Sequence, residues 1–424
     1  MLIAIAAIFV LAYAAIALEH PLRVNKSATA LLGAGLLWTI YAIATGDHAL
    51  VGRQLDESVA STAQIVFFLI GAMTIVEVID AHDGFEVITS LIRTTSQITL
   101  IWLIGFVTFF LSAILDNLTT TIVMISLIQK LVGARDDRLV FAAIIVIAAN
   151  AGGAWTVIGD VTTTMLWIGG QISPLRIMAS VFPASLVNLL LPLAVISYSR
   201  RGKSIAPPRK EDRDAIARFE RNLMFYLGLG TLIAVPAFKA VTHLAPFMGI
   251  LFGLGVLWLV GEIVHRHKDE HVRQPLTLVH ALTRIDMSSV VFFVGILLAV
   301  ACLEHAGLLS MLARWLDAAI GRQDVIVVVL GLLSAVIDNV PLVAATMGMY
   351  DLAHYPPDSF IWEFIAYCAG TGGSILIIGS AAGVAAMGLE RIEFLWYARR
   401  IAPPALAGYL AGAAVYVAQH AALH

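Results

Sequence analysis

Leu111-Ser-Ala-Ile-Leu-Asp-Asn117 is a heptapeptide that returns late in the chain as Leu333-Ser-Ala-Val-Ile-Asp-Asn339, with five of the seven positions identical. Each copy places an aspartate inside an otherwise apolar run. Acidic residues are rare within membrane-spanning helices and are mostly functional there. The two heptapeptides therefore indicate both where the helices are interrupted and where the chemistry lies.

Two further landmarks repeat in the same order. A glycine-rich stretch over 152–159, GGAWTVIG, has its counterpart over 372–379, GGSILIIG. Ahead of both heptapeptides, Phe67-Phe68 is followed by Glu77, and Phe292-Phe293 is followed by Glu304. Three landmarks at similar separations predict two related halves.

The composition places the chain in a membrane. Its residues are 60% hydrophobic and 13% charged, and the mean hydropathy is +0.90, whereas a soluble domain is about 45–50% apolar and about 25% charged. The net charge of −3 argues against a nucleic-acid partner, because no long basic block is available to cover phosphates. Cys302 and Cys368 lie in apolar runs and are interpreted as buried, unpaired side chains.

Hydropathy predicts an all-α integral membrane fold with about ten crossings plus two re-entrant hairpins. A bilayer core of ~30 Å requires about 20 apolar residues in a helix. The first run, at 2–18, lacks the preceding basic residue of a signal peptide and is taken as a retained span. Continuous spans are predicted at 2–18, 27–45, 62–80, 177–198, 222–240, 246–264, 286–305 and 401–419. Interrupted regions are predicted at 98–132, 138–170, 324–353 and 361–388.

These regions define a domain organisation. Each half is expected to contain one re-entrant helical hairpin and one broken transmembrane helix. The predicted parts are N-terminal scaffold spans at 1–59, a first repeat at 60–198, a linker at 199–221, connecting spans with a basic loop at 222–284, and a second repeat at 285–424.

Charge placement predicts the orientation. Basic residues favour the cytoplasmic side, and the linker carries Arg200, Arg201, Lys203, Arg209, Lys210 and Arg213. The linker 199–221 and the loop 265–285 are therefore predicted to be cytoplasmic and both termini periplasmic. We take 98–132 as a hairpin that enters and leaves on one side and 138–170 as a single crossing. Counting crossings from the linker, the span at 62–80 then runs inward and the span at 286–305 runs outward, so the halves have inverted topology.

Inverted repeats with discontinuous helices are the recurring plan of secondary transporters, which bind their cargo near the midplane. Oxygen ligands at the four breaks suit a small hard cation such as sodium. The first half offers Asp116, Asn117, Thr119, Thr120, Asn150, Thr156, Asp160, Thr162 and Thr163. The second half offers Ser334, Asp338, Asn339, Thr371, Ser374 and Ser380.

Asp160 has no acidic counterpart, because Ser380 occupies the equivalent position. The first half therefore holds the denser carboxylate site, and sodium is expected at Asp116, Asn117 and Asp160. A carboxylate withdrawn from water is costly to ionise, so it holds either a proton or a cation. Such competition couples the two ions and favours exchange over symport, and neither break contains an arginine or lysine to neutralise an organic anion.

Several of these residues have purely structural alternatives. Asn117 and Asn339 could cap helices, the threonines could bond a neighbouring helical carbonyl, and Glu77 could lie at the membrane interface. His265-Arg-His-Lys-Asp-Glu-His271 could bind a transition metal or sense pH, although a solvated basic loop explains it as well. The chain contains no nucleophile–base arrangement, phosphate loop or metal-hydrolase motif, so an enzyme is not expected and no cofactor is implied.

The motifs Asp116-Asn-Leu-Thr-Thr-Thr121, Asn150-Ala-Gly-Gly-Ala-Trp-Thr156 and Gly159-Asp-Val-Thr-Thr-Thr164 resemble the signatures of NhaD-type sodium/proton antiporters. These belong to the ion transporter superfamily, alongside divalent-anion/sodium symporters. The symporters have hairpin tips resembling Ser-Asn-Thr. This chain has Asp-Asn-Leu and Asp-Asn-Val, which favours the antiporter branch.

The resemblance implies a bacterial inner-membrane homodimer that exchanges cytoplasmic sodium or lithium for external protons, most active at alkaline pH, with an elevator-like transport domain. It also implies an ion site lined by Asp116, Asn117, Asn150, Asp160, Thr162 and Thr163, with Ser112, Asp338, Asn339 and Ser374 contributing from equivalent places. Two alternatives stay open: a sodium-coupled carboxylate or oxyanion transporter, and a polytopic membrane enzyme that uses His265, His267 and His271.

Overall fold

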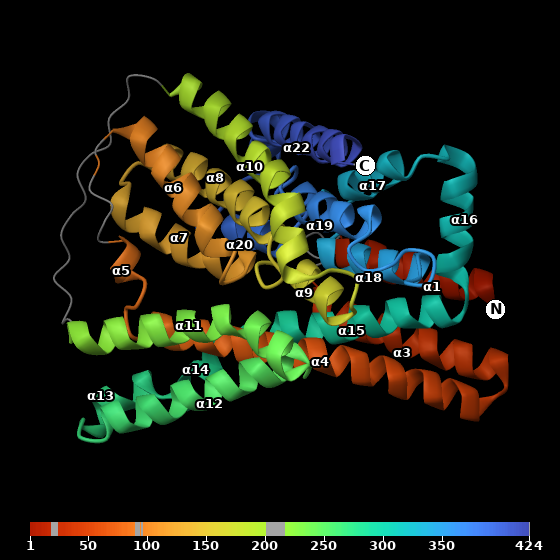
Figure 1. Ribbon diagram of the computed structural model, residues 1–424, viewed down its shortest axis with the longest axis horizontal. Helices are drawn as coiled ribbons and strands as arrows, with labels where there is room; N and C mark the ends of the chain where they lie inside the picture. Colours follow the sequence, from red (N-terminus) through yellow and green to blue (C-terminus); the bar gives the residue numbers. More distant parts are fainter. Residues whose placement is uncertain (18–23, 90–93, 95, 201–216, 424) are drawn as a thin grey trace.

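The computed structural model describes residues 1–17, 24–89, 94, 96–200 and 217–423, and every regular element in these ranges is a helix (Figure 1). The first half contains α1 Leu2–Ala17, α3 Lys26–Thr45, α4 His48–Ala81, α5 Glu86–Thr89, α6 Gln97–Ser112, α7 Asn117–Leu131, α8 Arg135–Gly153, α9 Val161–Ile168 and α10 Pro174–Ser199. The centre contains α11 Arg218–Thr242, α12 Pro246–His265, α13 Glu270–Arg273, η1 Gln274–Leu276 and α14 Leu278–Arg284. The second half contains α15 Met287–His305, α16 Leu308–Ile320, α17 Gln323–Leu333, α18 Asn339–Met349, α19 Phe360–Gly372, α20 Ala381–Glu390, α21 Phe394–Arg400 and α22 Ala402–Leu423.

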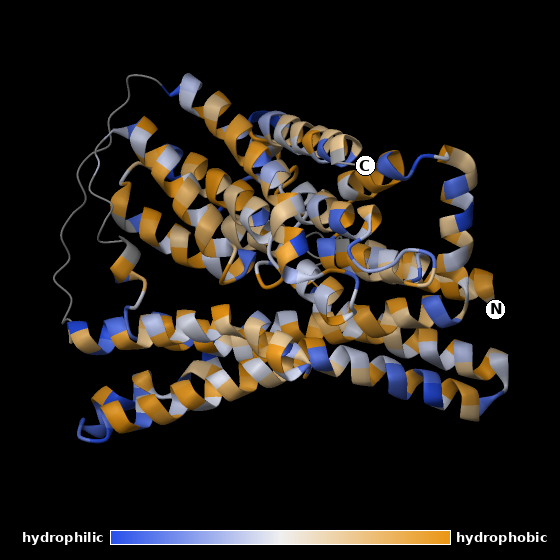
Figure 2. Cartoon of the chain, viewed as in Figure 1, coloured by the Kyte–Doolittle hydropathy of each residue, from blue (hydrophilic) through white to orange (hydrophobic). Residues whose placement is uncertain are grey.

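Six described helices, α3, α4, α10, α11, α12 and α15, are long and apolar enough to cross a membrane, and the bent pair α21–α22 would make a seventh. Figure 2 shows apolar residues along these helices and hydrophilic residues gathered at turns and helix ends. Large side chains such as Leu32 on α3 and Phe252 on α12 are exposed, as expected of a surface that faces lipid. The chain is a multi-pass membrane protein.

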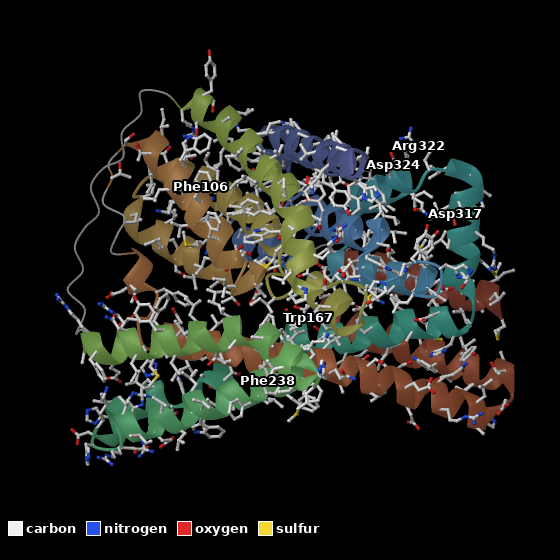
Figure 3. The ribbon with its side chains drawn as sticks, viewed as in Figure 1. Phe106, Trp167, Phe238, Asp317, Arg322 and Asp324 are labelled. Carbon is white, nitrogen blue, oxygen red and sulfur yellow. The ribbon has the colours of Figure 1, made fainter. Side chains whose placement is uncertain are left out.

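The helices form two layers, drawn as a lower layer and an upper bundle in Figure 1. In the lower layer α15 packs on α3 and α4, and α11 and α12 pack on α4 and on each other. The upper bundle contains α6 to α10 and α17 to α22, in which α10 packs along α22, α6 along α8, and α17 along α19. The layers meet where α9, whose Trp167 is labelled in Figure 3, contacts α4 and where α18 contacts α15.

All four predicted interruptions are present as breaks between short helices. The chain leaves helical geometry between α6 and α7, between α8 and α9, between α17 and α18, and between α19 and α20. Asp116 caps α7, Asp160 caps α9, Asp338 caps α18 and Ser380 caps α20, each through its side-chain oxygen. The polar residues that interrupt the apolar pattern therefore start the second helix of each pair.

The two halves make the same contacts at equivalent positions. Ser112 Oγ donates to the Ala149 carbonyl over 2.6 Å, and Ser334 Oγ donates to the Ala369 carbonyl over 2.8 Å. These bonds tie the first helix of each hairpin to the broken helix beside it. This contact recurs at equivalent positions of the sequence repeat, while the repeat architecture and the inverted orientation of the halves stay predictions.

Glycine is required where these helices cross. A Cβ on Gly152 would lie 2.1 Å from the Phe109 carbonyl oxygen, and a Cβ on Gly372 would lie 2.0 Å from the Gly331 carbonyl oxygen. We expect Gly152→Ala and Gly372→Ala each to destabilise the protein by about 1–3 kcal/mol, the usual cost of overpacking. The thermal midpoint of purified protein measures the effect.

Gly388→Ala on α20 is the matched control, because nothing lies within 4 Å of its added Cβ. It should leave the midpoint unchanged or slightly raise it, since alanine has the higher helix propensity. Equal midpoints for all three variants would contradict the close helix contacts.

Two helices differ from expectation. The span predicted at 62–80 is part of α4, a helix of 34 residues that begins at His48, so the boundary at 59/60 falls inside a helix. Arg53, Asp56 and Glu57 hid its first turns from a criterion based on apolar length. Helix α16 was not predicted, because its 13 residues are amphipathic and too short to span a bilayer.

The predicted linker 199–221 lies mostly outside the described residues. Within the described part, Arg200 pairs with Asp137 at 2.7 Å. Both cysteines are buried and unpaired, as predicted.

Candidate ion-binding site

Asp116, Asp160 and Asp338 line one cavity of ≈ 40 Å³ between the two layers. Each comes from a different break, so three segments remote in sequence converge there. Lower-layer side chains, including Phe68, Met73, Leu232, Ser289 and Phe293, close the other side. A water needs about 10–15 Å³ of such volume, so the cavity can hold a small ion with little accompanying water.

Asp160 is the centre of the site and is only 1% exposed. Its Oδ1 accepts from the Thr162 amide and hydroxyl, both at 2.9 Å. Its Oδ2 accepts from Asn117 Nδ2 at 2.6 Å and from Asn339 Nδ2 at 3.2 Å. The two hairpin-tip asparagines therefore meet at one carboxylate, one from each half.

Asn150, in the last turns of α8, joins the halves a second time. Its Oδ1 accepts from Asn117 Nδ2 at 2.9 Å, while its Nδ2 donates to Ser374 Oγ and Ser380 Oγ, both at 2.9 Å. Asn150 is completely buried, so this amide is satisfied entirely by site residues. Ser380, the counterpart of Asp160, accepts a hydrogen bond here and adds no charge.

Asp116 adopts an unusual backbone conformation, with φ 103° and ψ 156°. Residues other than glycine rarely occupy this region, which costs of order 1–3 kcal/mol and is concentrated at functional sites. Its carboxylate accepts from the Thr119 amide at 2.9 Å and from the Thr119 hydroxyl at 2.7 Å. The conformation turns a capped carboxylate toward the cavity.

Asp338 has a cationic neighbour that the sequence analysis missed. Lys26 Nζ lies 3.6 Å from Asp338 Oδ2 and 4.6 Å from the centre of the Phe292 ring. The expectation that no lysine or arginine is near the breaks holds along the sequence but is wrong in space, because Lys26 begins α3. Lys26 is a basic residue at the edge of an apolar span, and in the sequence it indicated only the orientation of that span in the membrane.

The other predicted residues fall into two groups. Asn117, Asn150, Thr162, Asn339 and Ser374 belong to the hydrogen-bond network around Asp160, and Thr119 to that of Asp116. The second group supports the breaks by bonding the main chain: Ser112, Ser334, Thr156 to Ala113, Thr163 to Asp160, and Thr371 to Tyr367. The buried Thr120 hydroxyl has no hydrogen-bond partner among the described residues.

Glu77 is not brought into the site. It lies toward the end of α4, where its Oε2 is 3.4 Å from Arg284 Nε, and it does not line the cavity. The sequence repeat placed Glu77 in register with Glu304, but α4 faces the cavity with Phe68, Leu69, Ala72 and Met73 instead. The Glu77 side chain does not lie on that face of α4 and instead pairs with Arg284.

The histidines of 265–271 do not form one constellation. His265 is buried, whereas His267 and His271 are exposed. His267 accepts a hydrogen bond from the neighbouring Arg266 at 2.9 Å. The arrangement needed by the three-histidine enzyme hypothesis is therefore not present in this loop.

Broken helices that bring three carboxylates together around one cavity inside an apolar bundle define a membrane transporter of the secondary-carrier class. The model of the citrate transporter family matches residues 13–363. Sodium/proton antiporter 1 of Arabidopsis thaliana is 51% identical over 99% of this chain and 72% of its own length. Na(+)/H(+) antiporter NhaD of Vibrio cholerae serotype O1 is 30% identical over 95% of this chain and 88% of its own.

The chain belongs to the family of NhaD-type sodium/proton antiporters. Among solved structures, the YdaH transporter of Alcanivorax borkumensis has the same fold, with a TM-score of 0.59, 12% identity, and coverage of 92% of this chain and 97% of that one. The relatives come from plants and bacteria, so the bacterial inner membrane stays a prediction.

Proposed function

We propose that this protein exchanges sodium or lithium ions for protons across a membrane, with the two ions competing for the carboxylates of the central cavity. The observation that carries this proposal is the charge of the cavity lining, which among the described residues consists of Asp116, Asp160 and Asp338 without a basic side chain. The names of the plant and bacterial relatives support the same exchange.

The hydrogen bonds suggest how the exchange is arranged. The amide hydrogens of Asn117 and Asn339 satisfy the Asp160 carboxylate in the structure. Rotation of either amide would present its oxygen to a cation held by Asp160 and Asp116. A proton on Asp160 would remove the charge that attracts the cation, so only one of the two ions is held at a time.

The movement proposed is elevator-like. The upper bundle carries all four breaks, whereas the lower layer contributes mainly apolar side chains to the cavity wall. A largely apolar contact favours sliding of one layer past the other, because the polar bonds that must be broken are few, the Lys26–Asp338 ion pair among them. The proposal includes a homodimer in the inner membrane. Its linker 199–221 and loop 265–285 are cytoplasmic, and its termini are periplasmic.

Sodium-coupled transport of an organic anion or oxyanion is the second candidate, and the match to the citrate transporter family favours keeping it. An anion would need positive charge in the cavity. The nearest cation in the described chain, Lys26, is already paired with Asp338. The geometry therefore favours a cation as the cargo.

The deciding experiment uses purified protein in sealed liposomes with an imposed pH gradient and a pH-sensitive dye. Added sodium or lithium should collapse the gradient with no organic substrate present, whereas choline chloride should not. If collapse occurred only after citrate or another carboxylate was added with sodium, anion symport would replace exchange. If no ion altered the gradient in any combination, sodium/proton exchange would be rejected.

A further inference from the structure

A second cluster of ionisable side chains lies outside the ion site, in the lower layer. His82 directly follows α4, Glu220 is in the first turn of α11, and His265 is the last residue of α12. Helices α4, α11 and α12 pack against one another, and this packing brings the three residues together near the α13 end of the layer (Figure 1). All three are buried.

The side-chain atoms that could bind a metal converge. His82 Nε2 is 3.2 Å from His265 Nε2 and 3.9 Å from Glu220 Oε1, and His265 Nε2 is 2.5 Å from Glu220 Oε1. In a tetrahedral zinc site the ligand atoms lie about 2.0–2.2 Å from the metal, and simple geometry then separates them by roughly 3.3 Å. The two imidazole nitrogens already match this spacing. Glu220 Oε1 would have to shift by less than about 1 Å relative to the two nitrogens, which a side-chain rotation can supply.

We propose that His82, Glu220 and His265 form a binding site for zinc or a similar divalent transition metal. Two imidazole nitrogens and one carboxylate oxygen are a ligand set that zinc accepts, with a fourth position left for water. The site is separate from the sodium cavity and does not depend on the function proposed above.

The His82 ring is oriented as a metal ligand requires. Its Nδ1 lies 2.6 Å from the Val78 carbonyl oxygen, which can only accept a hydrogen bond. The proton is therefore held on Nδ1, and the Nε2 lone pair is directed at His265 and Glu220. A second hydrogen bond that fixes the tautomer of a ligating histidine is the usual arrangement around protein-bound zinc.

Space for the missing ligand lies beside the cluster. A cavity of ≈ 10 Å³ is lined by Val78, His82, residues of α12 including His265, Arg273, and the segment 276–278. The Arg273 guanidinium is paired with Glu262. That volume is close to the space one water needs. A metal-bound water could therefore occupy the fourth position without displacing the helices.

Lys268 makes a specific counter-hypothesis possible. Its Nζ lies 2.7 Å from both carboxylate oxygens of Glu220, so the cluster could be a metal-free ion-pair network. Both hypotheses predict a lower thermal midpoint for Lys268→Met without zinc, but only the metal site predicts tighter zinc binding by this variant. Removal of the ammonium group would loosen an ion-pair network but free Glu220 for a metal.

The experiment measures zinc binding by full-length protein purified in detergent and stripped with a chelator. Zinc chloride is titrated while the thermal midpoint is followed, and cobalt chloride is titrated while the visible absorption of tetrahedral cobalt is followed. Wild-type protein should bind one ion per chain and melt at a higher temperature with zinc. His82→Ala, His265→Ala and Glu220→Gln should each weaken binding by about tenfold or more.

His267→Ala and His271→Ala are the matched controls, because both residues lie in the same loop and are exposed. They should bind zinc as the wild type does. Lys268→Met should bind zinc more tightly than the wild type while melting at a lower temperature without it. Binding that is unchanged in His82→Ala or Glu220→Gln, weaker in Lys268→Met, or absent from the wild type would overturn the metal site, whatever the result of the transport assay.

Discussion

Asp160→Asn is expected to abolish sodium-dependent proton release from liposomes, with the rate lowered at least about 100-fold, or about 3 kcal/mol. The asparagine side chain has nearly the same shape, and its oxygen can still accept from the Thr162 amide as Asp160 Oδ1 does now. Its amide nitrogen would take the place of Oδ2, so the Asn117 and Asn339 amides must rotate to present their oxygens to it. What is lost is the charge that binds the cation and the group that carries the proton. The protein should therefore insert and fold, and exchange should stop.

Asp351→Asn is the control for this substitution. It makes the same chemical change at an aspartate whose side chain is 64% exposed and outside the cavity, so exchange should continue at the wild-type rate. Normal rate and sodium affinity in Asp160→Asn would show that the centre of the site has been assigned to the wrong residue.

Asp116→Asn is expected to cause a loss of similar size. Asparagine and aspartate have the same branching and nearly the same size, so the substitution adds no steric cost to the backbone at φ 103°. Its oxygen can still accept from the Thr119 amide. The loss can then be attributed to the second carboxylate of the cavity. Initial rates over a sodium concentration series separate weakened binding from slowed transport.

Asp83→Asn provides the comparison for Asp116, since Asp83 also has a positive φ, 52°, and does not line the cavity. It should transport normally. If Asp116→Asn kept the wild-type rate and affinity, the cation would have to be held by Asp160 and Asp338 without it.

The sequence predicted those features, the site aspartates and the helix breaks, at which a polar residue interrupts an apolar pattern. An aspartate inside a lipid-length helix is so costly unless it is functional that Asp116, Asp160 and Asp338 stood out, and all three line the cavity. Three of the four helix breaks followed from the same residues, because the oxygen that interrupts one helix caps the next. The fourth followed from the repeated glycine-rich stretch and is capped by Ser380.

The features that could not be predicted depend on packing between distant segments. Lys26 looked like an ordinary basic residue at a span end, and only the packing of α3 on α15 brings it to Asp338. Glu77 was included among the site residues because its position repeats in the sequence. Which face of α4 points at the cavity depends on the rotation of the helix about its axis, which the repeat does not specify. His82 and Glu220 carried no signal beside His265, since the three meet only through the packing of α4, α11 and α12.

The bonds of Asn150 have a consequence for the energetics of the proposed cycle. One amide holds Asn117 on one side and Ser374 and Ser380 on the other, so the two halves of the site would travel together. The cargo would then meet an unchanged coordination shell at either face of the bilayer. The dissociation constant of the cation would therefore be the same at both faces, while the concentration gradients and the membrane voltage set the direction of net flux.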